Sequence, residues 1–326
     1  MKRRSFLTAL GAATAWPLVA RAQQPALPVI GFLSSASPRA FAHLVAAFRQ
    51  GLQTHGFVHG RNVWIDYRWA EGHYGDLPAM AADLANRKVA LIAATGGVVS
   101  ARAAIKATTT VPIVFVVGFD PVKLGLVASL NKPGANATGV SIFTTELVTK
   151  RLDLLTKLLP QMRTVAMLVN PGAAVTRIEI GDTSAAAQQL GLKLVTIEAT
   201  GEGDFEAAMQ SAVKQQAKAL LVSADPFFTS RRARLVALAA QHALPTMYPL
   251  RVYVEAGGLI SYGTELPWAY HQVGIYAGRI LKGAKPSELP VMLPSNFDLV
   301  INSATAKALG MTVPPEISAL AHEVTK

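Results

Sequence analysis

The sequence predicts an α/β protein made of two doubly wound parallel-sheet lobes. Short runs rich in Val, Ile and Leu alternate with longer Ala-rich segments whose apolar residues recur every three or four positions, a pattern typical of strands followed by helices. This order occurs in two successive series. A chain of 326 residues is long enough for two domains that each bury a core, and a composition of 51% hydrophobic and 16% charged residues excludes a disordered chain.

The first series begins with the apolar run from Pro28 to Ser35. It ends in small hydroxyl residues, as a buried parallel strand does where its carboxyl end opens into a loop. A helix follows, because apolar residues recur on one face between Phe41 and Leu52. The later elements that we expect are a strand at 62–69, a helix at 77–88, a strand at 89–94, a helix to about 106 and a strand at 112–117.

The second series begins near residues 136–141, where we expect the chain to leave the first sheet. Its strand Thr164 to Val169, followed by Asn170, occupies the same place as Val29 to Ser34 in the first series, which indicates a duplicated architecture. The expected elements are helices at 146–159, 173–190, 204–216 and 231–242, and strands at 164–169, 193–197, 219–222 and 245–248.

Glycines flank a short apolar strand near the end of the second series. Gly257-Gly258 precede Leu259 to Tyr262 and Gly263 follows, which permits the backbone angles that a bending connector needs. We interpret this stretch as a place where the chain crosses between the two lobes. Beyond it we expect a helix at 267–281, a strand at 297–302 and short helices at 303–309 and 315–324.

The first 22 residues have the pattern of an export signal. Basic residues from Lys2 to Arg4 precede an apolar run, and Ala20-Arg21-Ala22 provides a small-x-small cleavage site near Ala22. Arg3-Arg4 resembles a twin-arginine signal, although the general secretory route stays open. Pro17 interrupts the run, which is shorter than the roughly 20 residues of a spanning helix. We therefore expect a soluble periplasmic protein.

Charge and cysteine content narrow the classes of partner. The net charge is +11, and the expected cleavage removes four basic residues and leaves +7. No stretch combines clustered Lys and Arg with aromatic residues, so we expect no nucleic-acid partner. The chain has no Cys, which excludes disulfides, thiolate metal sites, cysteine nucleophiles and a lipid-modified cysteine anchor.

The sequence contains no recognisable enzyme motif. Its seven histidines have no spacing typical of a metal site, and no Gly-x-Ser-x-Gly elbow is present. Gly96-Gly97 does not continue into a dinucleotide-binding or phosphate-binding loop. We therefore expect a protein without catalytic residues, bound metal or cofactor.

The segment from Arg251 to Gly263 carries a family resemblance. Its paired glycine, the small Ser261 and the aromatic Tyr262 resemble a hallmark of the periplasmic substrate-binding proteins of ABC importers, in the tryptophan-binding-like group. The resemblance covers nearly the whole mature chain. It implies the type I periplasmic binding protein architecture, with three hinge crossings near residues 140, 262 and 290. The implied lobes are 27–139 plus 263–288 for lobe 1 and 140–262 plus 289–326 for lobe 2.

Candidate ligand-binding residues follow the strands, because the carboxyl ends of parallel strands face a crevice in open sheets. Small hydroxyl groups and a backbone N–H suit a carboxylate, acidic groups can hold an ammonium, and aromatic rings can pack on an apolar side chain. We prefer Glu255 among the acids, because it lies beside the family segment. The candidates are Ser34, Ser35, Thr95 and Gly96 for a carboxylate, Asp120, Asp225 and Glu255 for an ammonium, Phe227 and Tyr253 for an apolar group, and Asn170 at a strand end.

Each candidate also has a structural interpretation. The hydroxyl residues and Asn170 are common helix caps, and Asp-Pro pairs such as Asp120-Pro121 and Asp225-Pro226 are common in turns. Phe227 could belong to the core.

Together these features predict a monomeric solute-binding component of an ABC importer. It would bind an amino acid or similar carboxylate between its lobes and deliver it to a membrane permease by hinge closure. Two alternatives stay open at this point: a secreted α/β enzyme acting on a small metabolite, and a ligand-sensing subunit for a membrane kinase.

Overall fold

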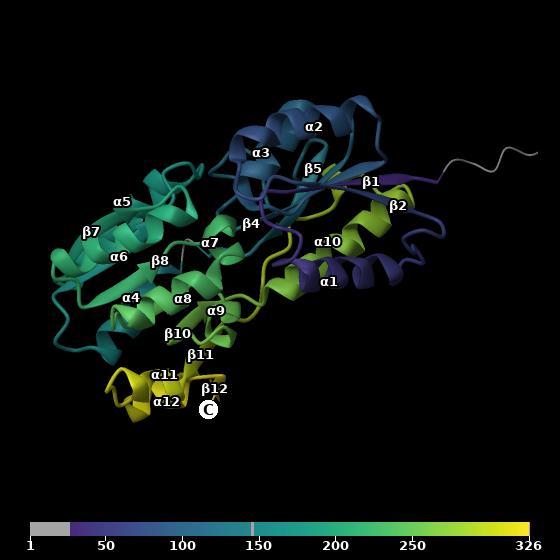
Figure 1. The fold of residues 1–326 in the computed structure, drawn as a ribbon. Helices are drawn as coiled ribbons and strands as arrows, with labels where there is room; N and C mark the ends of the chain where they lie inside the picture. Colours follow the sequence, from purple (N-terminus) through teal and green to yellow (C-terminus); the bar gives the residue numbers. More distant parts are fainter. Residues whose placement is uncertain (1–26, 145–146, 326) are drawn as a thin grey trace, which may run out of the picture.

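The computed structural model describes residues 27–144 and 147–325, so the predicted export signal lies outside the described residues. Two sheets form the framework, one of five strands and one of seven (Figure 1). Each sheet carries helices on both faces, as the sequence predicts. Within the described ranges, no helix is long and apolar enough to cross a membrane.

The first sheet is parallel throughout and has the strand order β2-β1-β3-β4-β5. Its central strands are almost completely buried because helices cover both faces. The strands are β1 (Val29–Ser34), β2 (Trp64–Trp69), β3 (Leu91–Ala94), β4 (Ile113–Val117) and β5 (Ala137–Ser141). The helices within this series are α1 (Ala42–Gln53), α2 (Leu77–Asn86) and α3 (Gly97–Ala107), with a short 3-10 turn at Tyr74–Asp76.

Strand β5 extends the first sheet beyond the point where the sequence predicted that the chain leaves it. It pairs with β4 up to the register Val117 to Ser141, and all five of its residues are buried. The run Ala-Thr-Gly-Val-Ser is weakly apolar, which is why it did not resemble a strand. The chain leaves the first sheet only after Ser141.

The second sheet has the order β12-β11-β10-β9-β8-β6-β7, and its pairs are parallel except β10 with β11. Its strands are β6 (Thr164–Val169), β7 (Lys193–Glu198), β8 (Ala219–Val222), β9 (Thr246–Tyr248), β10 (Ile260–Gly263), β11 (Asp298–Asn302) and β12 (Glu323–Thr325). Its helices are α4 (Val148–Leu158), α5 (Thr176–Gln189), α6 (Phe205–Lys214), α7 (Pro226–Ser230), α8 (Arg232–Gln241), α9 (Arg251–Glu255), α11 (Ser303–Ala308) and α12 (Pro315–Leu320). Short 3-10 turns lie at Glu202–Asp204 and Pro286–Glu288.

Three short elements of the second sheet region were not predicted. Helices α7 and α9 have five residues each, too few for an apolar stripe to show in the sequence. The predicted helix at 315–324 stops at Leu320, and the chain then forms strand β12 beside β11.

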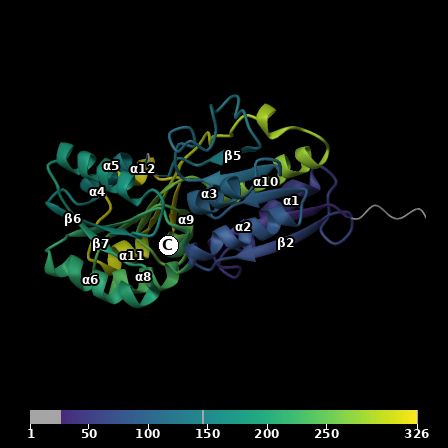
Figure 2. The same cartoon turned by 90° about the horizontal axis from the view of Figure 1, so that it is seen from above.

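Helix α10 (Leu266–Leu281) comes after β10 in the chain but packs on α1 beside the first sheet (Figures 1 and 2). The two helices approach closely at Gly51 and Gly274. A Cβ added at Gly51 would lie 2.0 Å from the carbonyl oxygen of His271, and one added at Gly274 would lie 2.1 Å from that of Phe48. A segment from late in the chain therefore packs beside the sheet that the early part of the chain forms. We use "first lobe" for the first sheet with α1–α3 and α10, and "second lobe" for the second sheet with its helices.

The chain passes between the lobes three times, and the crossing segments lie together. The first follows β5, the second joins β10 to α10, and the third runs from Met292, which bridges to Val140 in the first sheet, to β11. The hydroxyl of Thr264 donates to the carbonyl oxygen of Ile142 at 3.1 Å, which links the first two crossings.

Arg151 is buried beside the crossings, and among the described residues its guanidinium donates to carbonyl oxygens alone. Its guanidinium contacts those of Thr144 (2.6 Å), Tyr262 (2.8 Å) and Pro249 (3.5 Å). Burial lowers the pKa of Arg151 to about 10, so the side chain stays charged at neutral pH. One side chain of α4 therefore binds backbone from two of the three crossings.

Candidate functional site

A cavity lies between the two lobes, with an empty volume of about 720 Å³ that includes space open to solvent. Ligand sites occur preferentially at such interfaces between domains. The first lobe contributes Phe41, Thr95 to Val99, Val116 to Gly118, Ile142, Leu266 and Tyr270 to its wall. The second lobe contributes Ala173 to Val175, Ala224 to Pro226, Thr229 and Leu250, and Thr144 lies at the crossing.

The first wall is built on the ends of β3 and β4 and on the N-terminus of α3. Residues 96 to 99 open this helix, and its first N–H groups have no partner within the helix. Thr95 is only 3% exposed, and its hydroxyl oxygen has no hydrogen-bond partner among the described residues. The positive end of a helix dipole and an unused hydroxyl therefore meet at this wall.

Ser34 and Ser35, predicted to bind a carboxylate, lie buried behind this wall and do not line the cavity. The hydroxyl of Ser35 donates to the carbonyl oxygen of Gly96 at 2.7 Å, and that of Ser34 accepts from the N–H of Ala36 at 3.3 Å. The backbones of residues 35 and 96 pack so closely that a Cβ at Gly96 would lie 2.1 Å from the nitrogen of Ser35. The two serines support the loop that carries Thr95 and Gly96.

The second wall follows β6 and β8 in the same way. Asn170 lies behind it: its side-chain oxygen accepts from the N–H of Gly172 at 2.9 Å, and its carbonyl oxygen accepts from the hydroxyl of Thr176 at 2.5 Å. These bonds fix the loop that leads to the lining residues Ala173 to Val175.

Asp225 is the one carboxylate that lines the cavity in the part of the chain that the structure describes. Its side chain caps α7 by accepting from the N–H of Phe227 at 2.8 Å, and it accepts from the phenol of Tyr74 in the first lobe at 2.7 Å. Burial raises the pKa of Asp225, while bonds from Tyr74, the backbone of Phe227 and the side chain of Asn170 lower it. Burial and the neighbouring Asp225 raise the pKa of the Tyr74 phenol well above its ordinary value.

Helix α7 contacts the first lobe at several further points. The hydroxyl of Ser230 accepts from the N–H of Ser37 at 3.3 Å, and the guanidinium of Arg231 donates to the carbonyl oxygen of Glu71 at 3.2 Å. The ring of Phe227 fills the space where Gly72, with φ +95°, would carry a Cβ. The lobes are therefore in direct contact beside the cavity.

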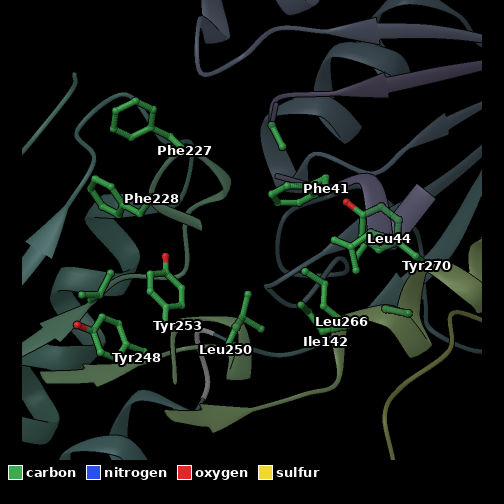
Figure 3. Close-up of a cluster of buried hydrophobic side chains, with 14 of the residues drawn as sticks. Phe41, Leu44, Ile142, Phe227, Phe228, Tyr248, Leu250, Tyr253, Leu266 and Tyr270 are labelled. Carbon is green, nitrogen blue, oxygen red and sulfur yellow. The ribbon is translucent and has the colours of Figure 1, made fainter. Parts of the chain in front are cut away.

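Apolar side chains of the two lobes face each other across the same region. Figure 3 shows Leu250 and Tyr253 of the second lobe on one side and Phe41, Ile142 and Leu266 of the first lobe on the other. All five belong to one continuous cluster of buried hydrophobic residues.

Four other predicted site residues lie away from the cavity lining. Asp120 accepts from the N–H groups of Val122 and Lys123, as a turn residue does. Phe227 packs against Phe205 and Phe228.

Tyr253 and Glu255 both lie on α9 but in different surroundings. Tyr253 stacks on Tyr248 with ring centroids 4.7 Å apart, and its phenol bonds to the hydroxyl of Thr229 at 3.3 Å. Glu255 is exposed and forms an ion pair of 3.0 Å with Arg251 on the same helix. Of the ten predicted residues, the cavity lining contains Thr95, Gly96 and Asp225.

A second buried acid, Glu179 on α5, lies behind the wall near Ala224. Burial raises the pKa of Glu179 to about 7, although the N–H of Ala224, which bonds to its carboxyl at 3.3 Å, and the charge of Arg151 both lower it. Burial therefore favours the neutral form of this carboxyl.

Several lining residues were not predicted, and some of them had a signal in the sequence. Val98 and Val99 open the helix after Gly96-Gly97, and Ala173 to Val175 follow the strand end at Asn170. Both groups therefore lie just after the carboxyl ends of strands, where ligands are expected to bind. Leu250 lies in the loop after β9 and had the same signal, whereas Phe41, Leu266 and Tyr270 had none, because they lie at or on helices.

The cavity combines apolar walls with hydrogen-bond donors at one end, which suits a small organic molecule with a polar group at one end. The described residues contain no cluster of three or more His, Cys, Asp or Glu side chains able to hold a metal ion.

The model of one protein family, described as ABC transporter substrate binding protein, matches residues 29–325. A tyrosine-binding protein of Clostridioides difficile (strain R20291) is 26% identical over 264 residues, which are 81% of this chain and 75% of that protein.

Solved structures resemble the chain over most of its length. A conserved domain protein from Vibrio cholerae has a TM-score of 0.84 at 27% identity. An ABC domain from Streptococcus pneumonia in complex with L-Trp has a TM-score of 0.79 at 25% identity. Each of these two comparisons covers 91% of this chain and 99% of the other chain. The ligand-free, open structure of a substrate-binding protein with adhesive properties from Clostridium difficile has a TM-score of 0.63 at 28% identity and covers 92% of this chain and 100% of the other.

Proposed function

This chain belongs to the ABC transporter substrate-binding protein family, and from that premise we propose that it is the periplasmic solute-binding component of an ABC importer. It binds one small organic solute, an amino acid or similar carboxylate, between its lobes, closes by hinge bending and delivers the solute to a membrane permease. It acts as a monomer without a cofactor, after export directed by residues 1–22.

The observation that carries this proposal is a cavity with walls from both lobes. A solute in it contacts the strand-end loops of the first sheet, at Thr95 and Gly96, and those of the second, at Ala224 and Asp225. Such a solute binds the closed form more tightly than the open form. This difference in affinity shifts the equilibrium between the two forms towards the closed one. A permease can then recognise the closed form.

Two features of the comparisons support the closed arrangement and the kind of solute. The chain resembles the L-Trp complex, with a TM-score of 0.79, more closely than the ligand-free open structure, with 0.63, although the identities are 25% and 28%. The relatives include a tyrosine-binding protein and a structure in complex with L-Trp, and both amino acids are small zwitterions with an aromatic side chain.

The crossings provide a place for the hinge. They lie side by side, linked by Thr264 and Ile142, and Arg151 binds backbone from two of them. Few residues need to change their backbone angles when the lobes rotate, which is the usual form of hinge closure.

Small-angle X-ray scattering tests closure directly. The purified protein is first screened by thermal shift against amino acids and small carboxylates, because a ligand that binds only the folded state raises its stability. The radius of gyration is then measured with and without the solute that gives the largest shift. We expect a smaller radius with solute, and recovery of the solute unchanged. Equal radii, or chemical conversion of the solute, would contradict the proposed function.

A further inference from the structure

The end of the first lobe that points away from the second lobe is basic. The parallel strands β1–β5 begin at this end, and the helices α1 and α10 run side by side towards it (Figure 1). Phe41 and Leu266, at the starts of these helices, line the cavity, whereas His55 and Gly278, at their ends, lie against each other. We call this surface the outer end of the first lobe. Its exposed basic residues are Arg61, Arg87, Lys88, Lys106, Arg279, Lys282 and Lys285.

Acidic residues neutralise only part of this charge. Asp66 and Asp83 each pair with an arginine, and Glu288 lies 3.7 Å from the ammonium of Lys285. Within the described ranges, no ion pair involves Arg61, Lys88, Lys106, Arg279 or Lys282. The helix dipole accounts for basic residues in the last turns of α3 and α10, but Arg61 lies in the loop before β2. An excess of positive charge therefore remains at the outer end.

Two histidines indicate the same excess. Burial and the charges of Lys282 and Arg279 lower the pKa of His55. Burial and the charge of Arg49 lower the pKa of His59. Positive potential thus extends from the end of α10 to the loop before β2.

An exposed aromatic side chain lies beside these charges. Trp64, the first residue of the edge strand β2, is 51% exposed, and its ring centroid lies 4.8 Å from that of His59. Leu27, next to the residue whose carbonyl oxygen accepts from the N–H of Trp64, is 43% exposed. Tryptophan is enriched at the headgroup level of bilayers, and basic residues are attracted to anionic lipids. The outer end therefore combines the two kinds of side chain that favour such a surface.

The chain also enters the first lobe at the outer end. Strand β1 begins at Val29, and the predicted cleavage site at Ala22 lies seven residues earlier. Seven residues span at most about 25 Å. A signal segment held in a bilayer would thus hold the outer end close to the lipid headgroups.

We propose that the outer end of the first lobe binds the surface of a phospholipid bilayer that contains anionic lipids, with Trp64 at the depth of the headgroups. The cavity lies at the opposite end of the same sheet, so the bound protein keeps it accessible to solute. This inference goes beyond the proposed function and is independent of the solute that the cavity takes.

Co-sedimentation with lipid vesicles tests the contact. The chain from Gln23 onward is used, because the basic and apolar residues before it could bind lipid by themselves. We expect binding to vesicles of phosphatidylcholine with about one third phosphatidylglycerol, and at least tenfold weaker binding to phosphatidylcholine alone. Binding to the anionic vesicles should also weaken at least tenfold between about 0.1 M and about 0.5 M NaCl. Equal binding to both kinds of vesicle, or binding to neither, overturns the inference.

A triple variant tests which charges carry the attraction. Arg61→Gln, Lys88→Gln and Lys282→Gln together remove exposed charges that form no ion pair, so the fold should be unaffected, which thermal unfolding checks. Binding to the anionic vesicles should weaken at least tenfold.

A second triple variant is the matched control. Lys193→Gln, Lys214→Gln and Lys218→Gln remove the same charge from exposed positions at the corresponding end of the second sheet, and binding should stay within about twofold. Equal losses in the two variants would mean that net charge alone attracts the protein, which overturns the inference.

Tryptophan fluorescence tests the orientation on the bilayer. Anionic vesicles with brominated acyl chains should quench the parent protein, and most of this quenching should disappear in Trp64→Phe. Trp69 and Trp268 remain as internal controls, because they lie at the end of β2 and at the start of α10, away from the outer end. Quenching that persists in Trp64→Phe would place another face on the bilayer and overturn the inference.

Discussion

The phenol of Tyr74 donates a 2.7 Å hydrogen bond to the carboxylate of Asp225, 151 residues further along the chain. The donor lies in the first lobe, and the acceptor lies in the second, at the lining of the cavity. The same carboxylate caps α7, whose residues also contact Ser37 and Gly72 of the first lobe. Asp225 thus joins the ligand cavity to the contact that keeps the lobes together.

Replacing Tyr74 with Phe removes this single bond and should favour the open form. A buried bond to a charged acceptor contributes about 1.5–3 kcal/mol, so the closed fraction without solute should fall and the apparent affinity for the solute should weaken roughly tenfold. Scattering and calorimetry measure the two effects.

Tyr67→Phe provides the control for that variant. The phenol of Tyr67 accepts from Arg49 at 3.0 Å within the first lobe, so its loss should change neither the radius of gyration nor the affinity. Equal behaviour of the two variants would show that the bond from Tyr74 does not influence closure.

The buried carboxyl of Glu179 should make the stability depend on pH. Its pKa is about 7 in the folded protein and near 4.5 in the unfolded chain, so the folded state binds the proton more tightly. The contribution of Glu179 to stability is therefore largest below pH 4.5, and it decreases as the pH rises towards about 7. The full loss is on the order of 3 kcal/mol above that pH.

Glu179→Gln should remove this dependence. Chemical denaturation at pH 5 and pH 8 should give a smaller difference in unfolding free energy for the variant than for the parent protein. Glu316→Gln, which replaces an exposed acid, should leave the difference unchanged. A variant with the parent's pH dependence would mean that Glu179 does not cause it.

The close approach of α1 and α10 should make Gly274 intolerant of any side chain. A Cβ at this position would lie 2.1 Å from the carbonyl oxygen of Phe48, a backbone atom that can move only with its helix. We expect Gly274→Ala to destabilise the protein by about 3 kcal/mol or more in thermal or chemical unfolding.

Gly181→Ala is the matched control for helix glycines. Gly181 is exposed in the interior of α5, and a Cβ there would meet no atom within 4 Å. This variant should be more stable by roughly 0.5–1 kcal/mol, because alanine loses less conformational entropy in a helix. Equal effects of the two variants would contradict the packing argument.

Arg151 should be essential for stability because its loss leaves buried carbonyl groups without donors. Arg151→Met should cost about 3 kcal/mol or more, which chemical denaturation measures. Arg163→Met is the comparison: Arg163 also donates to two carbonyl oxygens, those of Pro160 and Met162, but it is exposed. A change within about 0.5 kcal/mol is expected for that variant.

The β-α order was predictable from the sequence because each buried strand is a nearly continuous apolar run. Residues 164–169 and 219–222 form strands with the predicted bounds, because polar residues flank each apolar run in the sequence. Strand β5 lacked this signal, because Thr138, Gly139 and Ser141 are buried through pairing and packing that only the folded sheet provides.

The site was less predictable than the fold. The rule that ligands meet strand ends identified Thr95, Gly96 and Asp225, which line the cavity. It did not distinguish them from Ser34 and Ser35, which lie one layer deeper, or from Glu255, which is exposed on α9. That distinction depends on how the two lobes face each other, and local sequence patterns do not predict the arrangement of the lobes.

The packing of α10 on α1 has a consequence for the time at which the first lobe forms. During synthesis, the residues of β1 to β5 emerge well before those of α10, so the part of α1 that packs on α10 stays uncovered until residue 281 has left the ribosome. Contacts between such distant segments form slowly, so the nascent chain spends most of its synthesis without a finished domain. The first lobe, whose strands are made first, therefore acquires its last helix only after β10 of the second lobe has been made, because α10 follows β10 in the chain.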